Sequence, residues 1–188
     1  GVVDLETKEE DFVTHLVSAN THSDLLFFTN SGKAFQIKMY DIPEGRRATK
    51  GKSIMNFLSL SADEKVTSIL PTPKEIKKKT LNMIMVTRKG VAKKVSAESF
   101  KDVRRSGLIA IKLEKGDQLE SVLFVEKGDE VMIATTLGQS IRFKESDIRE
   151  MGRNAAGVRA IKIGSGDNVI GVDIIKPDQK DAALLTMS

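Results

Sequence analysis

The chain repeats one pattern of apolar and polar residues three times, at residues 25–32, 83–90 and 131–138. Each copy has four apolar residues, a Thr, two variable residues and a Gly. After the Gly, apolar and polar residues alternate, and only Lys93 interrupts the apolar positions. This alternation predicts a β-hairpin with a half-buried second strand, and the Gly suits a turn with positive φ. A spacing of about 50 residues between copies is typical of propeller-like arrays.

A second glycine and a further apolar stretch complete each copy. The second glycines are Gly51, Gly107 and Gly157. Apolar residues return in register after each glycine, and an acidic residue then precedes the last apolar stretch by two positions. The acidic residues are Glu64, Asp117 and Asp167. We therefore expect about four strands in each repeat, with a helical turn possible within residues 96–105 and 145–152.

These patterns predict a single all-β, propeller-like array of repeated four-stranded blades. Residues 25–80, 81–130 and 131–180 are the expected repeats. Residues 1–24 match the tail of a preceding repeat, and residues 181–188 match the start of a further one. We expect a piece of a longer array, truncated at both ends, whose exposed strand edges favour marginal stability or self-association.

Composition excludes several classes of protein. There is no Cys, which excludes disulfides and thiolate metal sites. No apolar run approaches the ~18 residues of a membrane-spanning helix. The two histidines, His15 and His22, have no partner at a metal-like spacing, and no nucleophile–base pair is found. We expect no catalysis, cofactor, metal, small-molecule substrate or membrane partner.

Positive charge gathers in the loops before the second glycines, although the net charge is only +4. Because repeats place equivalent loops on equivalent edges, these cations are expected on one curved rim. Arg guanidinium groups match phosphate oxygens, and such a rim suits a bent polyanion bound through its backbone. Ordinary solvated surface is the alternative. The candidate phosphate contacts are Arg46, Arg47, Lys50, Lys52, Arg104, Arg105, Arg153 and Arg159 in the loops, with Lys33, Lys89, Lys94, Arg142 and Lys144 on the hairpins.

Several stretches resemble the C-terminal domain of the bacterial DNA gyrase A subunit. The resemblance covers nearly the whole chain and is strongest at residues 8–12, 19–22, 110–113, 141–146 and 151–159. It implies a β-pinwheel, in which neighbouring blades exchange strands, and a basic rim that wraps double-stranded DNA to support negative supercoiling. It also implies an ATP-dependent DNA topoisomerase as the parent protein, acting in the bacterial cytoplasm at the nucleoid.

The resemblance further implies two protein partners, the N-terminal domain of the gyrase A protein and the gyrase B protein. The family's catalytic tyrosine belongs to that separate N-terminal domain, so we expect no DNA cleavage by this chain. The family's basic glycine-rich heptapeptide would end at Gly1. Two alternatives remain: the C-terminal domain of the topoisomerase IV A protein, and a propeller-like scaffold that binds protein through an apolar patch.

Overall fold

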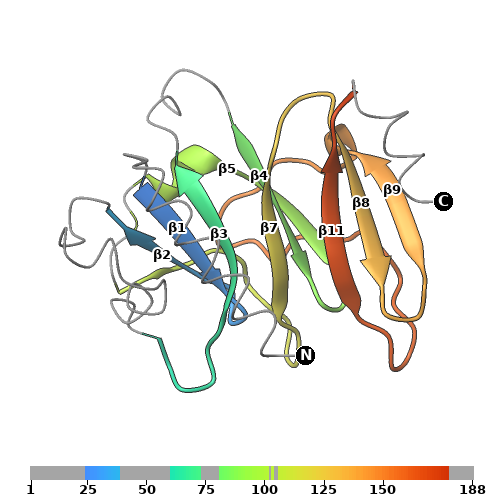
Figure 1. Cartoon of the computed structure of the whole chain (residues 1–188), viewed down its shortest axis with the longest axis horizontal. Coiled ribbons are helices and arrows are strands. Elements are labelled where there is room, and N and C mark those ends of the chain that lie inside the picture. Colours follow the sequence, from blue (N-terminus) through green and yellow to red (C-terminus); the bar gives the residue numbers. More distant parts are fainter. Residues whose placement is uncertain (1–23, 39–59, 73–80, 102, 104–105, 178–188) are drawn as a thin grey trace, which may run out of the picture.

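The computed structural model describes residues 24–38, 60–72, 81–101, 103 and 106–177. These residues form three antiparallel β-sheets that lie beside one another (Figure 1). The expected all-β architecture is confirmed. None of the helices in these ranges is long and apolar enough to span a membrane.

One hairpin forms the centre of each sheet. The hairpin strands are β1 (Asp24–Thr29) and β2 (Lys33–Ile37), β4 (Asn82–Thr87) and β5 (Val91–Ser96), and β8 (Glu130–Thr135) and β9 (Ser140–Lys144). The strand that follows later in each repeat pairs antiparallel with the first hairpin strand. These strands are β3 (Val66–Thr72), β7 (Leu119–Val125) and β11 (Val169–Ile175). Both expected helical turns are present as 3-10 turns, η3 (Ala97–Phe100) and η4 (Glu145–Asp147).

The hairpin turns explain the repeated Thr and Gly. Gly90 and Gly138 have φ of 92° and 86°, a region that a β-carbon disfavours, as the sequence predicted. The backbone N–H of Val91 donates to Thr87 Oγ1 at 3.1 Å, and Gln139 makes the equivalent bond at 3.1 Å in the third repeat. The Thr side chain therefore closes the turn that the Gly allows.

The repeated acidic residue fastens the later strand to the same turn. Asp117 Oδ1 accepts the N–H of Lys89 at 3.1 Å, and Asp167 Oδ1 accepts the N–H of Leu137 at 3.0 Å. Glu64 binds side-chain hydroxyls of the first turn. Burial acts to raise the pKa of Asp167, but hydrogen bonds from two Thr side chains and two backbone amides lower it below its ordinary value. The charged carboxylate is therefore part of the folded turn.

Neighbouring repeats exchange a strand. β6 (Leu108–Ile109) lies in the second repeat but pairs with β2 of the first. β10 (Val158–Arg159) lies in the third repeat but pairs with β5 of the second. We call these places the first crossing (residues 106–111 on β2) and the second crossing (residues 151–161 on β5). This exchange is the β-pinwheel arrangement that the resemblance implied.

The exchanged strands are shorter than the sequence predicted. The alternation suggested a strand through Ile111 and Ile161, but both residues lie beyond β6 and β10. The N–H groups of Ala110 and Ile111 both donate to Gly32 O, at 2.8 and 3.3 Å, so the chain turns away from the edge of β2. Gly90 O accepts the equivalent pair of bonds in the second crossing, at 2.9 and 3.2 Å.

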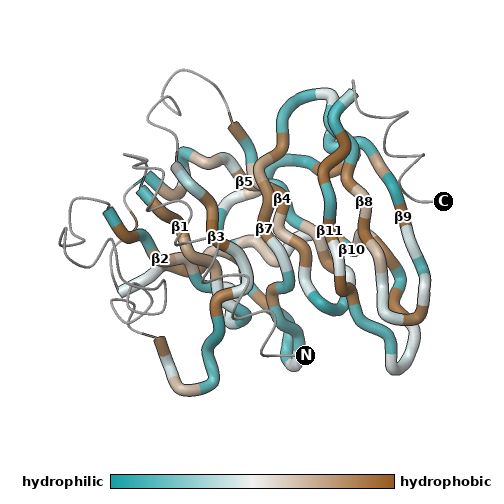
Figure 2. Tube along the Cα trace, viewed as in Figure 1, coloured by the Kyte–Doolittle hydropathy of each residue, from teal (hydrophilic) through white to brown (hydrophobic). Residues whose placement is uncertain are grey.

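The sheets pack face to face through two hydrophobic clusters. Phe28, Met83 and Met85 belong to the cluster between the first and second sheets. Ile84 and Ile133 belong to the cluster between the second and third. The strand β4 is therefore buried on both faces, and Figure 2 shows its hydrophobic residues at the centre of the array.

Candidate nucleic-acid interface

The array has an inner and an outer border. β7 contacts both β3 and β11, so the last strands of the three repeats lie together on the inner side. The sheet orders β3-β1-β2-β6, β7-β4-β5-β10 and β11-β8-β9 place β6, β10 and β9 at the opposite border. We call this border the outer rim; it comprises β2, β5, β9, β6, β10 and the loops that lead into β6 and β10.

The structure describes seven of the thirteen candidate contacts. These are Lys33, Lys89, Lys94, Arg142, Lys144, Arg153 and Arg159. The other six lie outside the described residues. They are Arg46, Arg47, Lys50, Lys52, Arg104 and Arg105.

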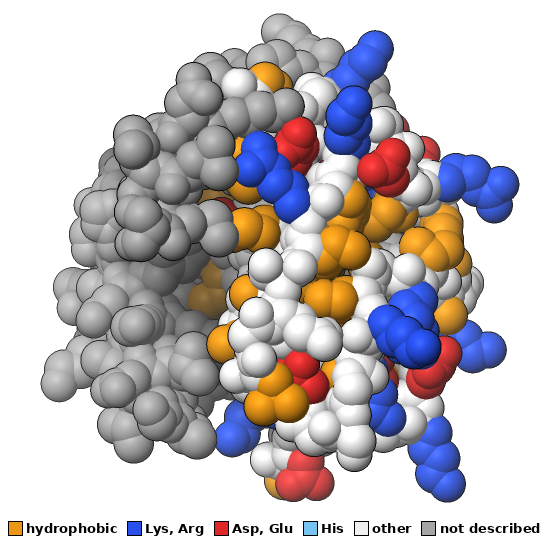
Figure 3. Space-filling model, turned by 90° about the vertical axis from the view of Figure 1, so that its right-hand side faces the viewer, with side chains coloured by type: hydrophobic (Ala, Val, Ile, Leu, Met, Phe, Trp, Pro, Cys, Tyr) orange, Lys and Arg blue, Asp and Glu red, His pale blue; other side chains and the backbone are white. Residues whose placement is uncertain are grey.

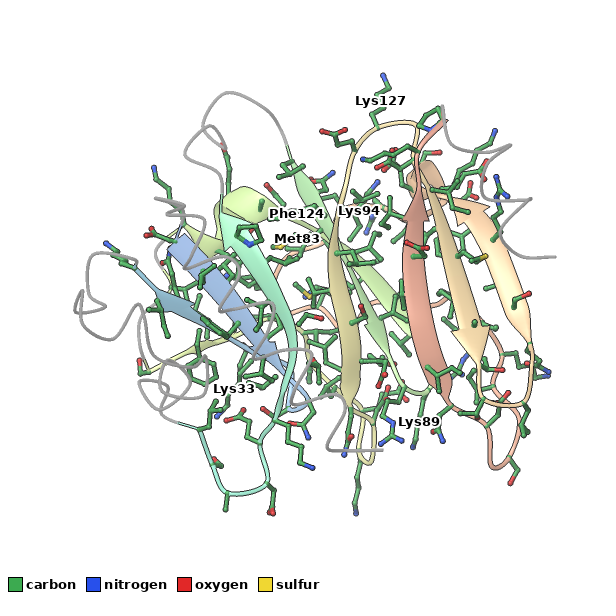
Figure 4. All side chains as sticks on the ribbon, viewed as in Figure 1. Lys33, Met83, Lys89, Lys94, Phe124 and Lys127 are labelled. Atoms are coloured by element: carbon green, nitrogen blue, oxygen red, sulfur yellow. The ribbon has the colours of Figure 1, made fainter. Side chains whose placement is uncertain are left out.

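Strand exchange brings cations from different repeats to the rim. Lys33 is exposed at the start of β2, opposite Ile109 of β6. Arg159 is exposed on β10, opposite Val91 of β5, which lies two residues beyond the exposed Lys89. Figure 4 shows Lys33 and Lys89 at the same ends of the first and second hairpins. Lys33 follows its hairpin glycine and Lys89 precedes its own, so the two cations lie at neighbouring rather than equivalent positions of their repeats.

The third repeat carries Arg142 and Lys144 on β9. The strand alternates between exposed and half-buried residues, and both cations are on its exposed side. Arg142 Nε bonds to Glu130 Oε2 on the neighbouring strand, which partly neutralises the guanidinium. Figure 3 shows Lys and Arg side chains around the border of this side of the molecule and hydrophobic side chains nearer its middle. Lys144 is therefore the freer of the two for an anion.

Lys94 was a candidate phosphate contact, but its side chain points into the protein. Its exposed fraction is 8% and that of Glu145 is 7%. Lys94 Nζ lies 2.8 Å from Glu145 Oε2 and 3.2 Å from the carbonyl oxygen of Glu145. The side chain fastens β5 to η4, and we leave Lys94 out of the rim cations.

Lys93 is a functional candidate that the sequence reasoning missed. The side chain is 0% exposed, and its Nζ donates to the carbonyl oxygens of Ala110 at 2.7 Å, Arg153 at 2.7 Å and Ala155 at 3.1 Å. Burial lowers the pKa of Lys93 to about 8, and the nearby charge of Arg153 lowers it in the same direction. The signal in the sequence was its position, because it is the one break in the apolar pattern.

The described residues hold no group of three or more His, Cys, Asp or Glu side chains that could bind a metal ion. Several of their carboxylates pair with lysines instead, as Asp129 does with Lys176 at 2.7 Å. The chemistry available at the outer rim in these ranges is that of exposed ammonium and guanidinium groups, which bind anions.

Comparison with known proteins identifies a family. Three consecutive segments, residues 23–73, 82–126 and 129–176, match the family described as "DNA gyrase C-terminal domain, beta-propeller". The chain is 41% identical to the DNA gyrase A protein of Escherichia coli (strain K12) over 179 residues, which cover 95% of this chain and 20% of the relative. It is 40% identical to the DNA gyrase A protein of Lawsonia intracellularis over 188 residues, 100% of this chain and 23% of the relative. The chain thus spans about a fifth of the length of the curated relatives it matches.

Two solved structures share the fold. The C-terminal domain of DNA topoisomerase IV has a TM-score of 0.74 and 28% identity, over 82% of this chain and 48% of that one. The DNA gyrase A C-terminal domain has a TM-score of 0.64 and 26% identity, over 81% of this chain and 48% of that one.

Proposed function

The chain belongs to the DNA gyrase C-terminal domain family, and we propose that it is a non-catalytic, DNA-wrapping module of a type IIA topoisomerase, the DNA gyrase A protein. The observation that carries this proposal is the set of exposed cations on β2, β9 and the exchanged strand β10 at the outer rim. Such cations bind a duplex by neutralising its phosphates, which requires no base contacts.

The proposed contacts come from all three repeats. Within the described residues they are Lys33, Lys89, Arg142, Lys144, Arg153 and Arg159. Six further candidates outside those ranges lie within five residues of Gly51 or Gly107 in the sequence, and we propose that they extend the set. They are Arg46, Arg47, Lys50, Lys52, Arg104 and Arg105.

The geometry of the array favours a bent duplex. The inner strands β3, β7 and β11 are neighbours, whereas β2 and β9 lie at opposite sides of the molecule (Figure 1). A duplex that contacts successive rim strands must therefore curve around the array. Bending a site of 20–30 base pairs by 40–90° costs about 1–6 kcal/mol, which several phosphate contacts offset through counterion release.

In the parent enzyme, wrapping would present a second DNA segment for strand passage and so support negative supercoiling. DNA cleavage and ATP hydrolysis would then belong to the partners, the N-terminal domain of the gyrase A protein and the gyrase B protein. The place of action is the bacterial cytoplasm, at the nucleoid. The C-terminal domain of the topoisomerase IV A protein is the second candidate, favoured by its TM-score of 0.74.

Wrapping can be tested with a closed circular plasmid. The chain is bound to relaxed plasmid, a type I topoisomerase removes the unconstrained supercoils, and the linking number is read on a gel after the protein is removed. We expect a shift that grows with protein concentration. An unchanged linking number at saturating protein contradicts wrapping.

Two variants of equal charge show whether the rim is responsible. Arg153→Ala/Arg159→Ala removes two rim cations, whereas Lys65→Ala/Lys127→Ala removes two exposed cations that adjoin the inner strands β3 and β7. We expect the first variant to reduce the shift and the second to leave it close to that of the unaltered chain. Equal losses would assign binding to net charge and contradict a role for the rim.

A further inference from the structure

Lys93 joins three separate parts of the chain. It lies in β5, and its three ammonium protons are all donated to carbonyl oxygens. One acceptor, Ala110 O, follows β6 at the first crossing. The other two, Arg153 O and Ala155 O, belong to the loop that leads into β10. A single side chain therefore connects the second hairpin to loops of both crossings.

The loop at the second crossing has few other attachments. Among the described residues, Met151 N donates to Lys94 O at 2.8 Å, where the loop begins. Ala155 N bonds within the loop, and Lys112 N reaches Ala155 O at 3.3 Å. Beyond Met151, the two bonds from Lys93 to residues 153 and 155, at 2.7 and 3.1 Å, are shorter than the bond from Lys112.

The charge of Lys93 is not matched by a carboxylate among the described residues. Its partner in register on β4 is Met85, and the cation that faces it from the loop is Arg153. The next residue, Lys94, lies on the opposite face of β5. Glu145 forms its ion pair with Lys94 on that face and so does not neutralise Lys93. The segments that pack near Lys93 also carry the cations Lys112 and Arg159, and both of these side chains are exposed to solvent.

Burial of an ionised side chain costs desolvation free energy, because the charge must leave water. The equivalent residues of the first and third repeats are Phe35 and Ile141, which fill the same position with apolar groups. Packing alone therefore does not explain a lysine here, whereas its three hydrogen bonds to the two loops do.

We propose that Lys93 is a positioning residue for DNA binding: its ammonium holds the loop of residues 151–157 against β5, so that Arg153 and Arg159 are presented to phosphate. This inference rests on the function proposed above. A bound phosphate backbone also stabilises the buried ammonium, so DNA binding and protonation of Lys93 favour each other. Raising the pH removes a proton, leaves at most two donors for three carbonyls, and loosens the loop.

The hydrogen bonds between Lys93 and the loop are tested without DNA, by amide hydrogen exchange. Lys93→Met keeps the length of the side chain and removes its donors, and Ile141→Met introduces the same residue at the equivalent position of the third repeat. We expect Lys93→Met to accelerate exchange tenfold or more at Met151 and Ala155, whose N–H groups are hydrogen-bonded in the unaltered chain, while β4 and β7 stay protected. Ile141→Met should leave exchange in this loop unchanged. Unaltered exchange in Lys93→Met overturns the proposal.

The consequence for binding is tested with a duplex of about 40 base pairs at fixed salt, between pH 7 and 9.5. We expect the affinity of the unaltered chain to fall above pH 8 by up to about tenfold per pH unit, the limit for one linked proton. Lys93→Met should bind about three- to tenfold more weakly at pH 7 and lose this pH dependence. Equal affinity and equal pH dependence in both proteins overturn the positioning role and leave the proposed function standing.

Two further results separate the alternatives. An unaltered chain that binds no duplex at any pH contradicts the proposed function, and the hydrogen-exchange result still decides whether Lys93 holds the loop. If Lys93→Met does not fold, calorimetry of the unaltered chain in buffers of different ionisation enthalpy measures the proton taken up on DNA binding at pH 8–9. Proton uptake supports the proposal, and its absence overturns it.

Discussion

The two crossings share one backbone arrangement but differ in the side chain beneath the exchanged strand. In both, a glycine with positive φ precedes the exchanged strand: Gly107 has φ of 87° and Gly157 has φ of 93°. At the first crossing an added β-carbon on Gly107 would lie 2.6 Å from the ring of Phe35, so the loop rests on an aromatic side chain. At the second crossing the equivalent side chain is Lys93, which binds loop carbonyls instead.

The comparison shows that the backbone path of a crossing does not depend on which side chain lies beneath the exchanged strand. Hydrogen bonds to Gly32 O and Gly90 O direct both crossings, so the residue three positions after each hairpin glycine is free to vary. At the first crossing Phe35 provides apolar packing. At the second crossing Lys93 provides hydrogen bonds from a titratable ammonium group, next to cations of the outer rim.

The largest effect is expected at the first crossing. Phe35 is 1% exposed and is among the largest buried side chains. Phe35→Ala should lower the free energy of unfolding by about 3–5 kcal/mol, because it removes apolar contacts and leaves a cavity. Chemical denaturation measures the change, and Leu137→Ala, at a residue that is 68% exposed, is the control. A loss below about 1 kcal/mol would show that the aromatic ring does not support the crossing.

Gly157→Ala should disrupt the second crossing through its backbone. The new β-carbon would lie 2.6 Å from Ala92 O, at a φ of 93° that L residues rarely adopt. We expect a loss of about 2–4 kcal/mol of unfolding free energy. Gly164→Ala, with no atom within 4 Å of the new β-carbon, should change it by less than about 0.5 kcal/mol. Equal effects of the two substitutions would contradict the close approach.

The pH dependence of stability should distinguish the crossings. The pKa of Lys93 is about 8 in the folded chain, below the ordinary value of 10.5, so between these values the unfolded chain binds more protons. Stability therefore rises with pH across this window, by about 1–3 kcal/mol relative to Lys93→Met. Denaturant titrations at several pH values measure the difference between the two proteins. A constant or falling difference would contradict the burial of a titrating ammonium.

The smallest effect is expected from a single rim cation. Arg159→Ala should reduce the magnitude of the salt slope of DNA binding by about 1, because one phosphate contact is lost. Lys127→Ala, which removes an equal charge from the turn after β7, should leave the slope unchanged. Titration of a duplex of about 40 base pairs at several salt concentrations measures both slopes. If both variants change the slope alike, the contact is not specific to the rim.

Much of the fold follows from the sequence because each repeat carries its own local signals. The alternation around Gly90 predicts the hairpin, and the positive φ of that glycine and its Thr87 bond explain the motif. The partner of each exchanged strand was harder to predict from spacing, since it lies in another repeat. That β6 and β10 end after two residues depends on bonds to Gly32 O and Gly90 O, which no local pattern reveals.

The site was less predictable than the fold. Lys94 falls on the polar side of the alternation, yet η4 covers that side and supplies Glu145. Lys93 interrupts the apolar side, and only the packed loops show that three carbonyls receive its ammonium. Exposure of a strand residue depends on what other repeats place over it, so a pattern within one repeat does not decide it.

The most direct test of the account is the salt dependence of duplex affinity, measured for the chain and for a variant with Arg46, Arg47, Arg104, Arg105, Arg153 and Arg159 changed to Ala. If roughly 6–8 phosphates are neutralised at the rim, the plot of log affinity against log salt should have a slope near −5 to −7, and the variant should flatten it. A slope flatter than about −2 for the unaltered chain, or an equal slope in the variant, would contradict DNA binding by the outer rim.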